Sequence, residues 1–471
     1  MDSVKVLFTI VVTALISACS VGPDYVKPPA DVPVEFKESG PWKVARPQDT
    51  LSRGEWWQIY HDSRLNSLEE RVTVSNQNLI AAEANFRQSQ ALVRATRSGY
   101  FPQVSAGASV NRARSSSGKS SSGSGSISTN FLLSAEASWE LDVWGRIRRS
   151  VEASQAGSQA SAADLESLRL STQAELALNY FQLQTIDAQT RLYEATISSF
   201  RQFLKLTNDR YAVGVVSQAD VLQAETQLRS TQAQALDLGV LRAQLEHAIA
   251  HLVGKPPAQF SLQPAPQDSI LPRISLSQPS ELLERRPDIA AAERRVAEAN
   301  ADIGLAKVAY FPAITLSSTA GFAASAFSNW LTWPNRVWSL GAVLAQTVFD
   351  GGLRSAQTDE ARAVYDATVA AYRETVLTGF VEVEDNLAAL RILEEEALVQ
   401  DQALQAAQQV LSITTHQYQA GTVAYLSVLV AQTTVLANKR SSVALAGRKY
   451  AASVLLVKAL GGGWIPEKPD M

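Results

Sequence analysis

The chain has 471 residues, of which 42 are Lys or Arg and 46 are Asp or Glu, giving a formal net charge of -4. This mildly acidic balance argues against nucleic acid as a partner, because phosphate binding needs a concentrated basic surface. The single cysteine excludes an internal disulfide framework and any metal site built from several thiolates. The length suggests two or three domains, or one large repeated structure.

The N-terminus reads as a processed, lipid-modified segment. Val6 to Ile16 form an uncharged apolar run of 11 residues, which as a helix rises only about 16 Å, roughly half a bilayer core. The stretch 16–19 then looks like a lipobox ending in Cys19. We expect residues 1–18 to be a signal peptide, Cys19 to carry diacylglycerol and palmitate, and residues 19–60 to form a lipid-anchored segment. Ser20 follows the cysteine, and the absence of Asp at this position resembles lipoproteins sorted to the outer membrane. The alternative is an ordinary signal peptide followed by an incidental cysteine.

The rest of the chain repeats once. Tyr100-Phe101-Pro102 matches 310–312 at an offset of 210 residues, and Tyr211 to Gly214 matches 418–421 at an offset of 207. Each half is predicted to run helix, two strands, long helix, turn, helix. We assign residues 61–254 to repeat 1, 255–279 to a Pro-rich linker, 280–461 to repeat 2 and 462–471 to a C-terminal tail.

The longest helices are predicted over two stretches without proline, residues 146–208 and 353–417. A helix of 63 residues, the length of the first stretch, spans roughly 95 Å. In the second stretch the apolar residues from Tyr365 to Leu390 repeat twice every 11 residues, a period that leaves neighbouring helices nearly straight. Straight helices side by side can wall a tube, and a plain coiled coil with a stutter is the alternative.

Four segments alternate between apolar and polar residues, as half-buried strands do. They are 104–111, 132–141, 314–322 and 338–349, the last being apolar on both faces in places. A soluble β-sandwich would account for this alternation. The flanking loops favour a membrane barrel instead, because 115–126 is almost entirely Ser and Gly and 323–335 carries Trp330 and Trp333.

The number of strands requires an oligomer. Lipid offers no partner for the amides at a sheet edge, so a membrane sheet must close, and known barrels start at eight strands. Three copies of a four-stranded chain would supply twelve strands and leave a conduit. We therefore expect a mainly α protein with membrane β: a trimeric 12-stranded barrel continued by a long α-helical barrel.

Four stretches together resemble one family. They are Cys19 to Tyr25 with Pro28-Pro29, the strand exit Trp139 to Arg146, its counterpart Phe349 to Arg354, and Tyr211 to Leu222. In combination they resemble the lipoprotein branch of the TolC-like outer-membrane efflux channels, over essentially the whole mature chain. The resemblance implies a homotrimeric exit duct in the outer membrane, with its helices in the periplasm. It also implies two partners, a periplasmic adaptor and an inner-membrane pump, commonly of the resistance-nodulation-division type.

Tight turns join the long helices in both halves. Glycine suits the left-handed residue that ends a helix, and Ser217 with Asp220 three residues later is typical of a capping box. In the resembled family these turns are the periplasmic tips that adaptor hairpins meet. We therefore expect docking there, and a plain helical hairpin is the alternative. The predicted docking residues are Val213, Gly214, Val215, Ala420, Gly421 and Thr422.

The periplasmic end departs from the family pattern. The family often has an Asp about nine residues after the second tip glycine, and here Val430 occupies that position. Leu426 and Val430 lie four residues apart on one helical face, so three copies could form an apolar constriction. Ordinary helix packing explains the pair equally well.

Enzyme chemistry has little support. His247 and His251 are four residues apart but lack the glutamate that follows the first histidine of zinc helices. The acidic stretches 382–385 and 394–396 are interpreted as solvated helix faces rather than as acid–base pairs. We expect no enzyme activity and no cofactor. The rival hypothesis is a lipid-anchored periplasmic adaptor or coiled-coil spacer with a soluble β-domain and no pore. The transported substrates cannot be read from the sequence.

Overall fold

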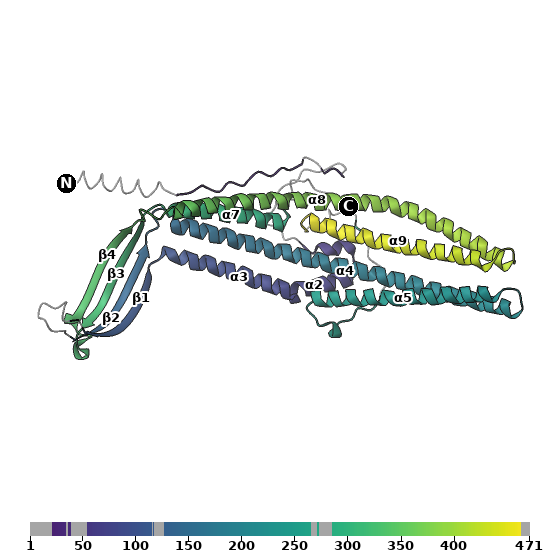
Figure 1. The fold of residues 1–471 in the computed structure, drawn as a ribbon, viewed down its shortest axis with the longest axis horizontal. Coiled ribbons are helices and arrows are strands. Elements are labelled where there is room, and N and C mark those ends of the chain that lie inside the picture. The colour runs from purple at the N-terminus through teal and green to yellow at the C-terminus, as the bar shows by residue number, and fades with distance from the viewer. Residues whose placement is uncertain are drawn as a thin grey trace, which may run out of the picture. The chain divides into compact units, whose positions relative to one another are not determined.

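The computed structural model describes residues 21–33, 36–38, 54–114, 116, 127–264, 271–272 and 285–462 (Figure 1). Cys19, the predicted signal peptide and most of the Ser/Gly stretch 115–126 lie outside these ranges. Among the described residues, no helix is both long enough and apolar enough to cross a membrane.

Two successions of elements follow the chain. The first contains η1 (Trp56–Tyr60), α2 (Ser63–Ser75), α3 (Gln77–Arg97), η2 (Ser98–Tyr100), β1 (Gln103–Arg114), β2 (Ile127–Glu140), α4 (Arg146–Ala212) and α5 (Gln218–Leu252). After η4 (Pro257–Gln259), the second contains α7 (Pro287–Val308), β3 (Ala313–Ala324), η5 (Phe327–Asn329), η6 (Trp333–Asn335), β4 (Arg336–Ala345), α8 (Leu353–Gln419) and α9 (Tyr425–Ala459).

Corresponding elements have matching lengths. β1 and β3 each have 12 residues, α4 and α8 each have 67, and α5 and α9 each have 35. Two details differ from the sequence prediction. The first half begins with two helices rather than one, because Asn76 has an extended backbone that ends α2. The last strand ends at Ala345 rather than Phe349.

The four strands form one antiparallel sheet in the order β1-β2-β3-β4. Register pairs such as Val104 with Ala137, and Leu133 with Phe322, define two faces. Even-numbered residues of β1, β3 and β4 share a face with odd-numbered residues of β2. This apolar face includes Val104, Ala108, Val110, Phe131, Leu133, Leu316, Phe322, Trp338, Leu340 and Leu344.

The opposite, polar face carries Ser105, Asn111, Glu136, Glu140, Thr319 and Ser339. Val337 and Val343 also lie on this face, which is why the last strand reads as apolar on both sides. Among the described residues, β1 and β4 each pair with a single neighbour, so both edges of this sheet lack a partner strand.

Aspartates begin the two longest helices at the strand exits. The Asp142 carboxylate accepts hydrogen bonds from the backbone N–H groups of Ile147 (2.8 Å) and Arg148 (2.9 Å). Asp350 accepts from the Gly352 N–H (3.0 Å), and its carboxylate pairs with the Arg354 guanidinium at 2.5 Å. These contacts satisfy N-terminal amides that have no partner within the helix. They explain the aspartates of the two strand-exit motifs.

The chain divides into two compact units. The first comprises 1–29, 85–162 and 291–373, and contains the sheet. In it the buried Arg149 holds the N-terminal segment: its guanidinium donates to the Val21 carbonyl (3.2 Å) and pairs with Asp24 (3.2 Å) and Glu152 (2.8 Å). The Tyr25 hydroxyl donates to the Glu293 carboxylate. The residues just after the predicted lipid site are therefore fixed on α4 and α7.

The second unit comprises 30–84, 163–290 and 374–471. Its largest core packs aromatic rings from η1, α4 and α9. Phe181 and Tyr450 stack with ring centroids 4.7 Å apart, and the buried Tyr60 hydroxyl lies 2.9 Å from the Ser453 hydroxyl. This core ties the N-terminal residues of the second unit to both of its long hairpins.

The two hairpins of the second unit end in the same way. The Asn76 side chain donates to the last carbonyl of α5, Leu252, at 2.8 Å. Arg286 donates to the Ala459 carbonyl, the last of α9, at 3.2 Å. Arg286 is buried and also pairs with Asp288 and Glu382. The Asn76 amide and the Arg286 guanidinium therefore have the same role, since each donates to the last carbonyl of a hairpin's second helix.

Candidate functional site

The first helical turn lies between α4 and α5. Gly214 has a φ of +75° and its N–H donates to the Tyr211 carbonyl at 2.9 Å, while the Val215 N–H donates to the Arg210 carbonyl at 2.9 Å. Ser217 and Asp220 form the predicted capping box, which is confirmed. Val213 and Val215 are 73% and 66% exposed. The turn therefore presents apolar side chains to its surroundings on a backbone fixed by hydrogen bonds.

The second turn, between α8 and α9, repeats this geometry. Gly421 has the same φ of +75°, and its N–H donates to the Tyr418 carbonyl at 3.0 Å. The Thr422 N–H and hydroxyl both donate to the Gln417 carbonyl at 2.9 Å. Ala420, Gly421 and Thr422 are all exposed. The six residues predicted to dock an adaptor thus lie on two similar turns, and the docking itself stays a prediction.

Arg210 connects the two turns. Its guanidinium donates 3.0 Å hydrogen bonds to the carbonyls of Tyr418 and Gln419, at the C-terminus of α8. It also lies over the Tyr418 ring, 4.5 Å from the ring centroid. A cation is favoured here because the last carbonyls of a helix carry partial negative charge. Sequence reasoning missed this residue, and its one local signal is a basic side chain in the last turn of α4.

A small aromatic core supports the turns. Tyr418 and Tyr425 are both 2% exposed, with ring centroids 5.8 Å apart. Burial, with a smaller contribution from the neighbouring Tyr418, raises the pKa of Tyr425 to about 12. The Tyr425 hydroxyl therefore stays neutral at physiological pH, and the packing beneath the turns does not change with its ionisation.

Leu426 and Val430 lie on the exposed side of α9. They are 54% and 57% exposed, whereas Val428 between them is fully buried. Packing among the described residues therefore leaves about half of each side chain uncovered, and the constriction itself stays a prediction. The two side chains form an apolar patch one helical turn long, close to the second turn, which is the arrangement that the constriction hypothesis requires.

The predicted metal and acid–base candidates do not assemble. His247 and His251 are exposed on α5, and among the described residues no group of three or more His, Cys, Asp or Glu could hold a metal ion. Interpreting 382–385 only as a solvated face was wrong in part. Glu382 pairs with Arg286 at 2.5 Å, and the Glu384 carboxylate accepts from the backbone N–H groups of Lys37 and Glu38. Glu382 and Glu384 therefore connect α8 with Arg286 and with residues 37–38.

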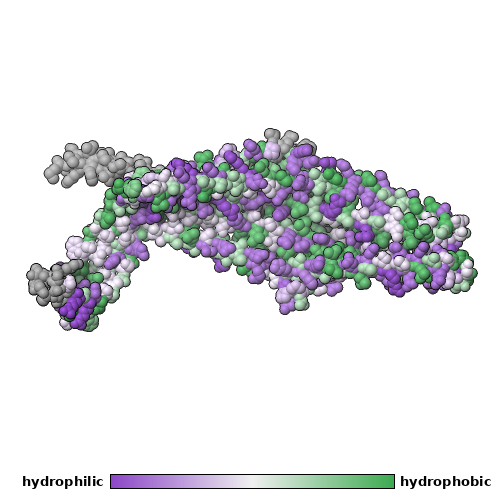
Figure 2. All heavy atoms as spheres, in the orientation of Figure 1, coloured by the Kyte–Doolittle hydropathy of each residue, from purple (hydrophilic) through white to green (hydrophobic). Residues whose placement is uncertain are grey.

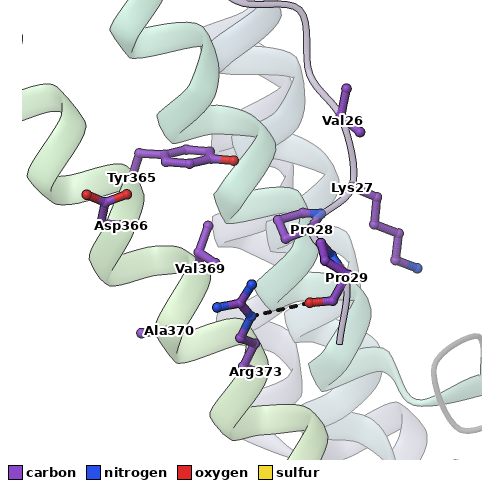
Figure 3. A pocket seen from close by; sticks show the side chains of 9 residues that line it. All are labelled: Val26, Lys27, Pro28, Pro29, Tyr365, Asp366, Val369, Ala370 and Arg373. Carbon is purple, nitrogen blue, oxygen red and sulfur yellow. Dashed lines mark hydrogen bonds between the residues drawn. The ribbon is translucent and has the colours of Figure 1, made fainter. Parts of the chain in front are cut away.

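One pocket lies beneath the N-terminal segment in the first unit. Its volume is about 480 Å³. Arg373 lies beside Pro29 and donates to its carbonyl at 3.3 Å, and the Tyr365 ring extends from α8 toward the segment (Figure 3). The lining has a single carboxylate and contains no histidine, cysteine, serine or threonine. The lining residues are Val26, Lys27, Pro28, Pro29, Tyr365, Asp366, Val369, Ala370 and Arg373.

The comparisons with known proteins identify the family. The family described as outer membrane efflux protein matches residues 69–255 and again residues 278–462. The chain belongs to this family. The pyoverdine export outer membrane protein OpmQ of Pseudomonas aeruginosa is 30% identical over 469 residues, covering 97% of this chain and 98% of OpmQ. The probable efflux pump outer membrane protein TtgC of Pseudomonas putida is 30% identical over 464 residues, covering 98% of this chain and 96% of TtgC.

Solved structures agree with the sequence relatives. The outer-membrane channel OprN is similar with a TM-score of 0.87 and 31% identity, covering 95% of this chain and all of OprN. The outer membrane protein VceC of Vibrio cholerae has a TM-score of 0.81 and 28% identity, covering 89% of this chain and all of VceC. The TolC-like resemblance is thus confirmed. The chain is an outer-membrane protein of a channel family, not of an enzyme family, with its helical part in the periplasm.

Proposed function

We propose that the chain is the outer-membrane exit duct of a tripartite efflux system. It conducts passively the small molecules that an inner-membrane pump and a periplasmic adaptor hand over. The observation that carries the proposal is a four-stranded sheet with one apolar face, one polar face and two unpaired edges, joined to helices of 67 residues. An apolar outside and a polar inside suit a water-filled pore in lipid.

Three copies complete the duct. The edges β1 and β4 cannot remain unpaired in hydrocarbon, where an unsatisfied amide costs several kcal/mol. β4 begins and β1 ends at the same end of the sheet, so β4 of one copy can pair antiparallel with β1 of the next. Twelve strands give a pore, whereas the eight strands of a dimer would be filled by side chains.

The two halves of the chain form an internal repeat. Matching element lengths, two matches to one family, and equivalent contacts of Asn76 and Arg286 at the ends of α5 and α9 support this proposal. Each half then contributes one hairpin of strands and one hairpin of helices to the ring. The mature chain is anchored by lipid on Cys19, two residues before the Val21 carbonyl that Arg149 holds.

The two turns at residues 213–215 and 420–422 dock the adaptor, and Arg210 keeps them together when the duct is at rest. Leu426 and Val430 of three copies form the apolar constriction that replaces an acidic gate. The pump is of the resistance-nodulation-division type, as the resemblance implies. The names of relatives mention pyoverdine, toluene and antibiotics, and for this chain the proposal extends only to small molecules.

Outer-membrane fractions test the duct against the adaptor alternative. Unheated samples should migrate as a trimer and heated samples as a monomer, because inserted strands resist detergent until they are heated. A strain lacking the chain should become sensitive to compounds that its pump exports. A chain found in membrane fractions only as a monomer, whether heated or not, would contradict the duct and favour the lipid-anchored spacer.

A further inference from the structure

Three arginines lie on the apolar face of the sheet, all at one end. Arg112 is in register with Thr129, Arg114 with Ile127, and Arg336 with Phe322, so each shares a face with residues that point away from the polar side. This end, which we call the loop end, is where β1 leads toward β2 and β3 toward β4. The opposite end leads into the long helices. In Figure 2, hydrophilic residues gather at the end of the sheet farthest from the helices.

The face has no anion to match these cations. All three arginines are exposed, and none forms an ion pair with a carboxylate among the residues that the structure describes. The two carboxylates of β2, Glu136 and Glu140, lie on the polar face. In a barrel, the arginines therefore face outward toward lipid without an internal counter-charge.

Aromatic residues lie beside these arginines at the loop end of the sheet. Phe131 is in register with Val110, next to Arg112 on the same face, and its ring contacts those of Phe327 (5.8 Å) and Trp330 (5.7 Å). The Arg336 guanidinium lies 4.3 Å from the centroid of the Trp333 ring. Such aromatic groups favour the boundary between hydrocarbon and headgroups. Arg112 and Arg114 lie on the loop side of Phe131, and Arg336 lies beside Trp333.

A cation on the lipid-facing side is tolerated near the interface and costly at the bilayer centre. Long arginine side chains can also extend their charge toward the headgroups. Arginine differs from lysine in matching phosphate with a planar, bidentate set of donors. Arginines without a carboxylate partner at the loop end of both edge strands therefore suit a phosphate-bearing headgroup better than general attraction to a surface.

We propose that Arg112, Arg114 and Arg336 bind the phosphate groups of a phosphorylated glycolipid in the outer leaflet. The inference rests on the proposed trimer, because pairing β4 of one copy with β1 of the next brings Arg336 of one chain to the end of the strand that carries Arg112 and Arg114. The site is then completed between copies and occurs three times around the barrel. The lipid seals the seam between neighbouring chains.

Lipid binding to purified trimers tests the proposal, with lipopolysaccharide as the probe. Binding is counted by native mass spectrometry for the wild type and for the triple variant R112Q/R114Q/R336Q. Each phosphate-binding arginine contributes a factor of several to affinity, so the triple variant should bind about 100-fold more weakly. R112K/R114K/R336K retains the charge and should recover part of the affinity. The control R87Q/R94Q/R97Q removes the same charge from exposed arginines of α3 and should bind like the wild type.

Two further measurements distinguish binding of a lipid-borne phosphate from binding of free inorganic phosphate. Dephosphorylated lipopolysaccharide should bind the wild type as weakly as lipopolysaccharide binds the triple Gln variant, and an excess of inorganic phosphate should not displace the lipid. Displacement by inorganic phosphate would overturn the lipid assignment, as would equal binding by the triple Gln variant. If that variant does not assemble, wild-type affinity in the triple Lys variant would overturn bidentate recognition. Absence of wild-type trimers would instead contradict the proposed function itself.

Discussion

Glu69 is a carboxyl group enclosed by the core of the second unit. Its side chain is fully buried, and among the residues that the structure describes neither carboxyl oxygen has a hydrogen-bond partner. Burial raises the pKa of Glu69 well above its usual range. Burial therefore favours the neutral acid in the folded chain, since a buried charge without a partner is far costlier than a neutral acid.

Glu69 should make the stability of the folded chain depend on pH. Because its folded pKa lies above its unfolded value of about 4.3, its contribution is complete below that value and is lost as pH rises through the folded pKa. We expect Tm of the wild type to fall more steeply with rising pH than Tm of Glu69→Gln, by a few degrees.

Thermal unfolding, followed by circular dichroism from below about pH 4.3 upward, measures how steeply Tm of each variant falls with pH. The exposed neighbour Glu70 provides the control, because Glu70→Gln removes a carboxylate from the same helix without touching the core. Parallel pH profiles for the wild type and Glu69→Gln would show that the carboxyl is already ionised in the folded state.

The helical turns are the elements whose local geometry was most predictable. Gly214 and Gly421 both adopt a φ of +75°, and a Cβ at either position would meet nothing within 4 Å. A side chain there would cost about 1 kcal/mol of backbone strain. It would not clash with any other described residue. A bulky residue would project from the tip and obstruct a partner.

Gly214→Trp and Gly421→Trp should abolish resistance to exported compounds while leaving the trimer in the membrane. Gly351→Trp is a matched control, since Gly351 has a φ of +63° and equally open surroundings but lies before α8 in the first unit. Resistance assays and unheated gels of membrane fractions give the two readouts. Loss of the trimer in the tip variants would favour a purely structural role for the turns.

Local patterns in the sequence predicted the helices and strands. Contacts between residues that are distant along the chain were not predicted. Proline-free runs predicted α4 and α8, alternation predicted β1 to β3, and Ser217 with Asp220 predicted a helix start. Arg210 escaped notice because Tyr418 and Gln419 lie more than 200 residues away along the chain. Asn76 and Arg286 escaped it too, because an amide and a guanidinium share no sequence signature. A contact between two residues far apart along the chain produces no periodic pattern in the sequence from which it could be predicted.

Closure of the whole duct depends in our proposal on contacts at the periplasmic end. Arg210 joins the two hairpin turns of one chain through two carbonyls and an aromatic ring. Arg210→Gln should weaken this joint by about 1 kcal/mol, the typical net contribution of an intramolecular hydrogen bond. The population of open channels should then rise about fivefold.

Single-channel recording in planar bilayers measures the open population. Arg229→Gln is the control, because Arg229 is an exposed residue of α5 that pairs with Glu225 in its own helix. Leu426→Ser tests the apolar constriction in the same assay and should also increase opening. Unchanged closure in Arg210→Gln would remove Arg210 from the gate, and unchanged closure in Leu426→Ser would remove the constriction.

The two unpaired sheet edges have a genetic consequence. In a ring, each chain pairs one edge strand with the copy on either side. The sheet of each chain is therefore complete only when both neighbours are folded. A copy whose β1 cannot pair also deprives the next copy's β4 of its partner. Because the ring then cannot close, one faulty chain inactivates a trimer that contains two sound ones. Edge-strand mutations should therefore behave as dominant alleles when both forms are made in one cell.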